Sequence, residues 1–173
     1  MRKTLPQQDQ ARHVDKRGAM RHWLMKTEPE AYSIERLRRE KTTPWTGVRS
    51  FQARNNMQEM RLGDLALFYH SSIAEPAAVG ICKVVKESYP DFSQFEQDGE
   101  YFDGRAKPDK PIWMMVDVGY VEQFPRAVTI AEMRAEPRLT GMALLKRGQR
   151  LSVQPVTTPE WEIVLELARR DAP

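Results

Sequence analysis

The chain has few of the residues on which metal sites, disulfide frameworks and membrane spans depend. Its 173 residues include one cysteine, Cys82, so an internal disulfide is excluded and a reducing compartment is expected. The three histidines lack the spacing of zinc ligands. No apolar run approaches the roughly 20 residues that a transmembrane helix needs, and none resembles the apolar segment of a secretory signal. We therefore expect an intracellular, cytoplasmic or nucleoid-associated protein with no metal, no cofactor and no membrane partner.

The motifs of common enzymes are also missing. The chain has neither a G-x-x-x-x-G-K-[ST] phosphate loop nor a G-x-G-x-x-G dinucleotide fingerprint. His70 followed by Ser71 suggests a hydrolase. However, neighbouring residues of a strand point to opposite faces of the sheet, so they cannot readily act as base and nucleophile for each other. We expect a protein that is not an enzyme, with a hydrolase built on these two residues as the weaker alternative.

Basic residues are concentrated in two parts of the chain. Residues 1–22 carry a net charge of +4 while the whole chain carries +3, which leaves −1 for the rest. Within that rest, residues 36–61 hold seven basic and two acidic side chains, and residues 87–109 hold two basic and seven acidic ones. A basic surface is typical of nucleic-acid binding, although most charged segments are simply solvated.

Hydrophobic periodicity predicts one mixed α/β (α+β) domain over 21–173. A disordered basic arm with few apolar groups is expected over 1–20. The predicted strands lie at 22–26, 65–70, 78–85, 112–123 and 150–156. Short helices are predicted at 33–40, 51–60, 129–135, 141–146 and 158–168. Long strands without a repeated βαβ unit favour a strongly curved, barrel-like mixed sheet with flanking short helices.

The stretch from Trp45 to Met57 is the strongest indication of a binding surface. It places one large ring, the guanidinium groups of Arg49 and Arg54 and several amides, Asn55 among them, close together in the sequence. This mixture suits a surface that stacks on a flat ligand, hydrogen-bonds its edge and holds a phosphate. The alternative is a connecting helix with Trp45 in the core.

Polar residues also lie where the predicted strands end. Lys26 and Thr27 close the first strand, and His70 and Ser71 close the second. Strand ends beside loops carry many ligand-binding groups, and hydroxyl groups can hydrogen-bond the edge of a base. On the last strand, alternation places three polar residues on one face: Arg150, Ser152 and Gln154. The alternatives are an ordinary turn, solvated charges and a polar face that meets water.

Five motifs follow one another in an informative order. They are WLMKTEP at 23–29, WTGVRSFQARNNM at 45–57, GD at 63–64 with FYHS at 68–71, YPD at 89–91, and RLSVQPV at 150–156. Together they resemble the EVE domain family over about residues 21–168. Thr27 stands where this family usually has Ser, and Ser50-Phe51 where it usually has Asn-Tyr. The resemblance implies a PUA-like fold, similar to the YTH and SRA domains that read methylated bases.

The same resemblance implies a non-catalytic nucleic-acid-binding module. It would accommodate a methylated or hydroxymethylated base, flipped into a pocket of the curved sheet. DNA is expected ahead of RNA, and any effector would be a separate protein. Trp45 would stack on the base. The other candidates would read its edge, hold phosphates or complete the site: Lys26, Thr27, Arg49, Arg54, Asn55, His70, Ser71, Arg150, Ser152 and Gln154. A sensor of nucleosides or other small molecules that uses the same pocket, and a protein-interaction module, are the alternatives.

Overall fold

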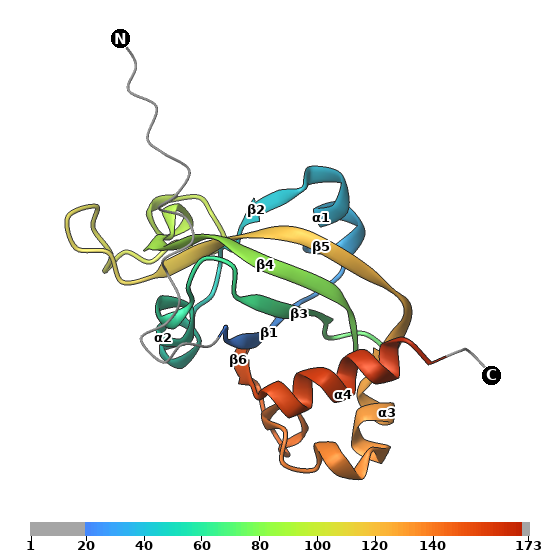
Figure 1. Cartoon of the computed structure of the whole chain (residues 1–173). Coiled ribbons are helices and arrows are strands. Elements are labelled where there is room, and N and C mark those ends of the chain that lie inside the picture. Colours follow the sequence, from blue (N-terminus) through green and yellow to red (C-terminus); the bar gives the residue numbers. More distant parts are fainter. Residues whose placement is uncertain (1–19, 171–173) are drawn as a thin grey trace.

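A six-stranded mixed sheet organises the part of the chain that the computed structural model describes, residues 20–170 (Figure 1). The predicted arm, apart from Met20, lies outside these residues. The strands are β1 (His22–Thr27), β2 (Thr42–Pro44), β3 (Leu65–His70), β4 (Ala77–Pro90), β5 (Met114–Thr129) and β6 (Val153–Val156). They are arranged in the order β2-β5-β4-β3-β1-β6. Only β1 and β3 run parallel; the other pairs are antiparallel.

The sheet is strongly curved because its two longest strands are irregularly paired. The register between β4 and β5 shifts at four places, and such bulges increase local twist and bend the strand. At Gly80 the two backbones approach so closely that a Cβ atom would lie 2.4 Å from the carbonyl oxygen of Glu122. The prediction of a curved mixed sheet with short helices is therefore confirmed, and β4 and β5 are the long bent ribbons of Figure 1.

Short helices cover the sheet, and most begin at a hydroxyl cap. The α-helices are α1 (Ile34–Glu40), α2 (Phe51–Glu59), α3 (Ile130–Ala135) and α4 (Thr158–Ala168). Three short 3-10 helices accompany them: η2 (Phe92–Phe95), η3 (Pro137–Leu139) and η4 (Ala143–Leu145). Ser33 and Ser50 cap α1 and α2, whereas Thr129 and Thr157 form capping boxes at α3 and α4. None of the described helices is long and apolar enough to cross a membrane.

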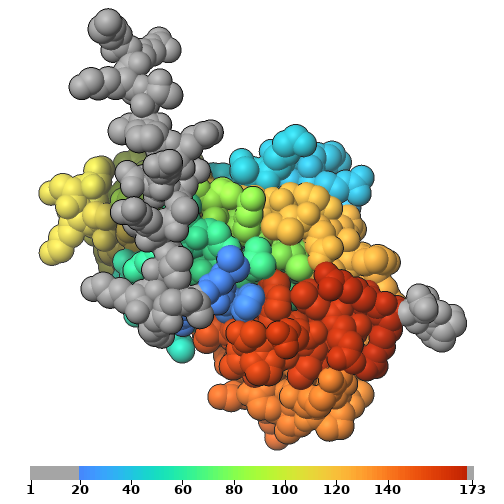
Figure 2. Space-filling model, in the orientation of Figure 1, coloured from blue at the N-terminus to red at the C-terminus, as the bar shows by residue number. Residues whose placement is uncertain are grey.

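Alternation along the strands builds two hydrophobic cores, one on each face of the sheet. Phe68 of β3 belongs to the core that α1 and α2 cover, together with Trp23, Trp45 and Met57. Its neighbour Tyr69 belongs to the core formed with α3, α4, η3 and η4. In the space-filling view the orange and red C-terminal segments form one lobe, while the yellow part of the loop before β5 projects on the other side (Figure 2).

The structure differs from the predicted elements in several places. β4 runs on to Pro90 and β5 to Thr129, beyond the predicted ends at 85 and 123, and the 3-10 helices η2 and η3 were not predicted. β2 was not predicted because three residues are too few to show a period. The helix predicted at 141–146 is only the 3-10 turn η4, and the last strand begins at Val153 instead of position 150. Phe51, which helical spacing places inward, is 53% exposed, and one face of its ring stacks on Trp113 with ring centroids 4.9 Å apart.

Candidate nucleic-acid interface

Three of the predicted site residues meet at a hollow beside the ends of β1 and β3. Lys26, Ser71 and Arg150 line it together with residues that sequence reasoning missed: Tyr69, Ser72, Pro76, Ile130, Arg134, Leu144, Lys146, Gly148 and Gln149. The hollow has a volume of about 330 Å³. This lies at the lower end of the range for ligand pockets, roughly 300–1,000 Å³. Its walls come from four separate parts of the chain, so only folding brings them together.

The pairing of β1 with β3 explains why the predicted strand-end residues separate into two groups. The parallel register places Lys26 beside Tyr69 and Thr27 beside His70. The backbone N–H of Ser71 donates to the carbonyl of Thr27 at 2.9 Å, which closes this edge of the sheet. Successive side chains of a strand point to opposite faces of the sheet. Lys26 and Tyr69 therefore face the hollow, while Thr27 and His70 face the side of the core that contains Trp45 and Phe68.

The hollow is positively charged. Four cations line it: Lys26, Arg134, Lys146 and Arg150. No carboxylate of residues 20–170 is in its lining. None of these four is ion-paired to an acidic side chain of residues 20–170. Burial lowers the pKa of Lys26, whose Nζ donates to the Gln149 carbonyl at 3.4 Å. Burial raises the pKa of Tyr69 to about 12, so its hydroxyl stays neutral. An anionic ligand in the hollow would be attracted by these cations.

Thr27 and His70 form hydrogen bonds that hold the connection to α1. The Thr27 hydroxyl donates to the carbonyl of Tyr32 at 3.2 Å. The buried His70 accepts, through Nε2, a hydrogen bond of 3.2 Å from the backbone N–H of Ile34 at the start of α1. Burial lowers the pKa of His70, although the charge of Glu35 opposes this. His70 thus serves as a neutral acceptor for a helix terminus, and no hydrogen bond among the described residues joins it to Ser71.

Trp45 lies in the core. Its side chain is 7% exposed, and its ring meets Phe68 edge to face at a centroid distance of 5.5 Å. Its backbone N–H donates to the carbonyl of Val116 at 2.8 Å, so the pairing of β2 with β5 continues to Trp45, just after β2. Phe68 and Tyr69 point to opposite faces of the sheet, so Trp45 and the hollow are on opposite sides of it. The stacking role of Trp45 stays a prediction, and it requires neighbouring side chains to move.

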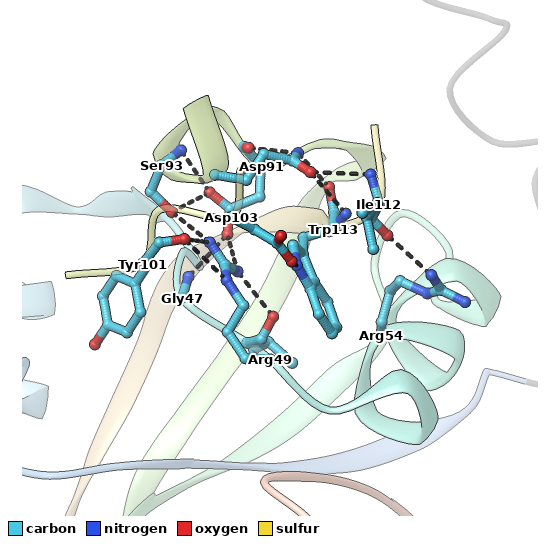
Figure 3. Close-up of polar contacts among 11 residues, drawn as sticks. Gly47, Arg49, Arg54, Asp91, Ser93, Tyr101, Asp103, Ile112 and Trp113 are labelled. Carbon is cyan, nitrogen blue, oxygen red and sulfur yellow. Dashed lines mark hydrogen bonds and ion pairs between the residues drawn. The ribbon is translucent and has the colours of Figure 1, made fainter. Parts of the chain in front are cut away.

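The guanidinium of Arg49 is held by groups of the protein itself (Figure 3). It forms an ion pair of 3.1 Å with the fully buried Asp91, and it donates to the Ser93 hydroxyl at 3.1 Å and to the Tyr101 carbonyl at 2.7 Å. Asp91 also accepts a hydrogen bond of 2.8 Å from the backbone of Gly47. We call Arg49, Asp91, Ser93 and Tyr101 the Arg49 cluster. It joins the segment before α2 to the loop after β4, two segments that are far apart in the sequence.

Trp113 and Arg54 extend these contacts beyond the Arg49 cluster. The indole N–H of Trp113 donates to Asp103 at 2.9 Å. The pKa of Asp103 is well below its usual range because Arg105 and then Trp113 hydrogen-bond the carboxylate. Arg54 donates to the Ile112 carbonyl at 2.9 Å and to the Asn55 side chain at 3.0 Å. The guanidinium groups of Arg49 and Arg54, two of the groups predicted to hold phosphates, are therefore largely engaged within the protein.

The residues predicted on the last strand have three different environments. Arg150 is exposed and reaches the hollow from the segment before β6. The Ser152 carbonyl accepts a hydrogen bond of 2.8 Å from the backbone of Lys26. Gln154 is buried and donates to the Leu151 carbonyl at 2.8 Å. Because β6 begins at Val153, strand alternation applies to only one of the three predicted residues.

The hollow and the Arg49 cluster lie at opposite ends of β4. Pro76, which lines the hollow, precedes this strand, and Asp91 of the cluster follows it. Fourteen residues at about 3.3 Å each correspond to roughly 46 Å along the strand. The predicted residues therefore do not form one site.

A larger hollow of about 470 Å³ lies near the start of β1 and the N-terminus of α4, but none of the predicted residues lines it. Within residues 20–170, no group of three or more His, Cys, Asp or Glu side chains could hold a metal ion. The candidate site is therefore the cationic hollow at the ends of β1 and β3.

Comparison with known proteins agrees with this architecture. The sequence model of the EVE domain family matches residues 21–167 of this chain. The chain belongs to the EVE domain family. Human thymocyte nuclear protein 1 is 42% identical over 169 residues, which cover 87% of this chain and 75% of the human protein.

Two solved structures share the PUA-like fold of this EVE domain. A hypothetical protein from Leishmania major has a TM-score of 0.84 and 42% identity, with 87% of this chain and 95% of that chain covered. The human THYN1 protein was solved in complex with DNA containing 5-methylcytosine. It has a TM-score of 0.83 and 42% identity, with 88% of this chain and 99% of that chain covered.

Proposed function

We propose that this EVE domain binds DNA that contains 5-methylcytosine. The modified nucleotide would occupy the hollow at the ends of β1 and β3. The observation that carries the proposal is the meeting of Lys26, Ser71 and Arg150, three residues predicted from separate motifs, in a hollow without a carboxylate. The human relative solved with methylated DNA supports DNA as the partner.

The cations of the hollow would hold the phosphates that flank the modified nucleotide. Arg134, Lys146 and Arg150 are exposed, whereas Lys26 is half-buried. The exposed cations can therefore reach a backbone that lies across the opening. Each phosphate that they neutralise releases condensed counterions, so the affinity of the complex depends on salt concentration.

The base itself would leave the stack and enter the hollow. Extrusion costs a few kcal/mol, and less for a single strand, so contacts inside the hollow must offset that cost. The hydroxyl groups of Ser71 and Ser72 can donate to or accept from the edge of a base. Tyr69 contributes a neutral hydroxyl. The methyl group adds only about 1 kcal/mol when buried, so discrimination against unmodified cytosine should be about fivefold.

Fluorescence anisotropy with labelled oligonucleotides tests the proposal. One sequence is prepared as single strand and duplex, with cytosine, 5-methylcytosine or 5-hydroxymethylcytosine at one position, and as RNA. The native protein should favour the modified DNA. Arg150→Gln should bind it several-fold more weakly, and the slope of log affinity against log salt should decrease by about 1.

Lys107→Gln is the matched control because Lys107 is exposed in the loop before β5, away from the hollow. It should leave the affinity and the salt slope near those of the native protein. Equal affinity of the native protein for modified and unmodified strands would contradict the proposal. Tight binding of the free nucleoside with no gain from a flanking phosphate would favour the sensor alternative.

A further inference from the structure

A short loop at the opening of the hollow is held at both ends. Residues 71–76 connect β3 to β4, and Ser71, Ser72 and Pro76 line the hollow. The Ser71 N–H donates to the Thr27 carbonyl at 2.9 Å, and the Pro76 carbonyl accepts from the N–H of Ile130 at 2.8 Å. The tip between these two attachments is exposed. Its position relative to the hollow is thus set by β1 and α3.

The tip presents one large apolar side chain to solvent. Ile73 is 40% exposed and does not itself line the hollow, so it does not fill it. Among the exposed large apolar residues of the described part of the chain, only Ile73 lies in a segment that borders the hollow. The residue before it, Ser72, has φ of 56°, a left-handed conformation that non-glycine residues rarely adopt. This loop therefore keeps both a strained backbone and an exposed aliphatic group beside the proposed site.

We propose that Ile73 is a wedge that enters the base stack of duplex DNA when the modified base leaves it. The inference rests on the proposed function. Extruding a base leaves a gap between its neighbours, and the loss of stacking opposes the extruded state. Several DNA-bending proteins insert Ile, Leu, Phe or Met between base steps, which partly unstacks and kinks the duplex. Ile73 is a positioning residue in this scheme, because it stabilises the opened duplex and leaves recognition of the base to the hollow.

The test compares a duplex with its own single strand, because only the duplex needs a wedge. Both carry one 5-methylcytosine, and binding is measured for the native protein, Ile73→Ser and Ile73→Leu. Ile73→Ser should weaken duplex binding by about tenfold, since it loses the burial of an aliphatic side chain. Its single-strand affinity should change by less than about twofold, as for other surface substitutions. Ile73→Leu keeps an aliphatic side chain of the same size, so its duplex affinity should stay near that of the native protein.

Leu62→Ser is the matched control. Leucine has the same size as isoleucine, and Leu62 is 43% exposed, close to the 40% of Ile73. It lies in the turn before β3, outside the hollow. This variant should bind both DNA forms as the native protein does. An equal loss on both forms with Ile73→Ser, or no loss on either, would overturn the wedge. If the native protein binds the modified single strand but not the duplex, the wedge is overturned while the proposed function stands. If it binds neither, the proposed function itself fails.

Discussion

The segment from Trp45 to Met57 and the hollow at the ends of β1 and β3 use similar residues for different purposes. Both contain aromatic, basic and small polar side chains, which are typical of nucleic-acid binding. In the first, Trp45 fills the core and Arg49 pairs with Asp91. In the second, four cations line one hollow, and no carboxylate of the described residues is in its lining.

This difference shows that a basic side chain indicates a binding site only when the protein leaves its charge uncompensated. A guanidinium that pairs with a buried carboxylate stabilises the fold, and removing either partner leaves a buried charge alone. Cations that line a hollow without a carboxylate partner remain available to attract an anion. The first arrangement should therefore be sensitive in stability measurements, and the second in binding measurements.

The largest expected effect comes from Trp45. Trp45→Ala should lower the free energy of unfolding by about 3–5 kcal/mol, because it leaves a cavity beside Phe68 in the core. Urea denaturation followed by circular dichroism measures this change. A loss below about 1 kcal/mol would show that the ring is not a core residue.

Trp45→Phe separates the core role of this ring from the predicted stacking role. It keeps an apolar ring and should retain the fold at the temperature of a binding assay. If the indole only fills the core, the folded variant binds 5-methylcytosine DNA as tightly as the native protein. If the indole stacks on the base, the affinity falls even though the protein remains folded.

A somewhat smaller effect is expected for the Arg49 cluster. Arg49→Ala leaves the fully buried Asp91 without its cation and should cost about 3 kcal/mol of stability. Arg105→Ala is the matched control, because Arg105 also pairs with an aspartate but its side chain is 69% exposed. The control should unfold at nearly the native urea concentration. Comparable losses of unfolding free energy in the two variants would contradict the distinction between an ion pair with a buried carboxylate and one at the surface.

The smallest effect concerns His70, whose ring lies against Phe68 on the Trp45 side of the sheet. Burial lowers its pKa in the folded state, so below pH 6.5 the unfolded chain takes up a proton more readily than the folded protein. The stability contributed by neutral His70 is complete above that pH and is lost as the pH falls towards the folded-state pKa. His22 has a lowered pKa from the same cause and contributes in the same direction.

His70→Gln tests this contribution because its amide oxygen can still accept the hydrogen bond from Ile34 but does not titrate. Chemical denaturation between pH 7.5 and pH 5 should show a weaker loss of stability for this variant than for the native protein. His22→Gln provides the comparison for the second histidine. Identical pH profiles for His70→Gln and the native protein would show that His70 does not contribute.

Most elements could be predicted from the chain, because their signals are local. The N-cap Ser33 with buried Ile34 and Leu37 marks α1, and the apolar run from Leu65 marks β3. β2 escaped prediction because its three residues pair with β5, a contact across some seventy positions of sequence that no local period records. Phe51 was misplaced because its partner, Trp113, lies on a different part of the chain.

The sequence by itself determined the family and the order of the longer strands and helices along the chain, since these depend on short motifs and periodicity. Only the tertiary structure decided which basic residues are free to meet a ligand. Arg49 finds its carboxylate 42 positions away, whereas Arg134 and Lys146 come to Lys26 from the other end of the domain. The energy of an ion pair depends on distance and burial, and both exist only after the chain has folded.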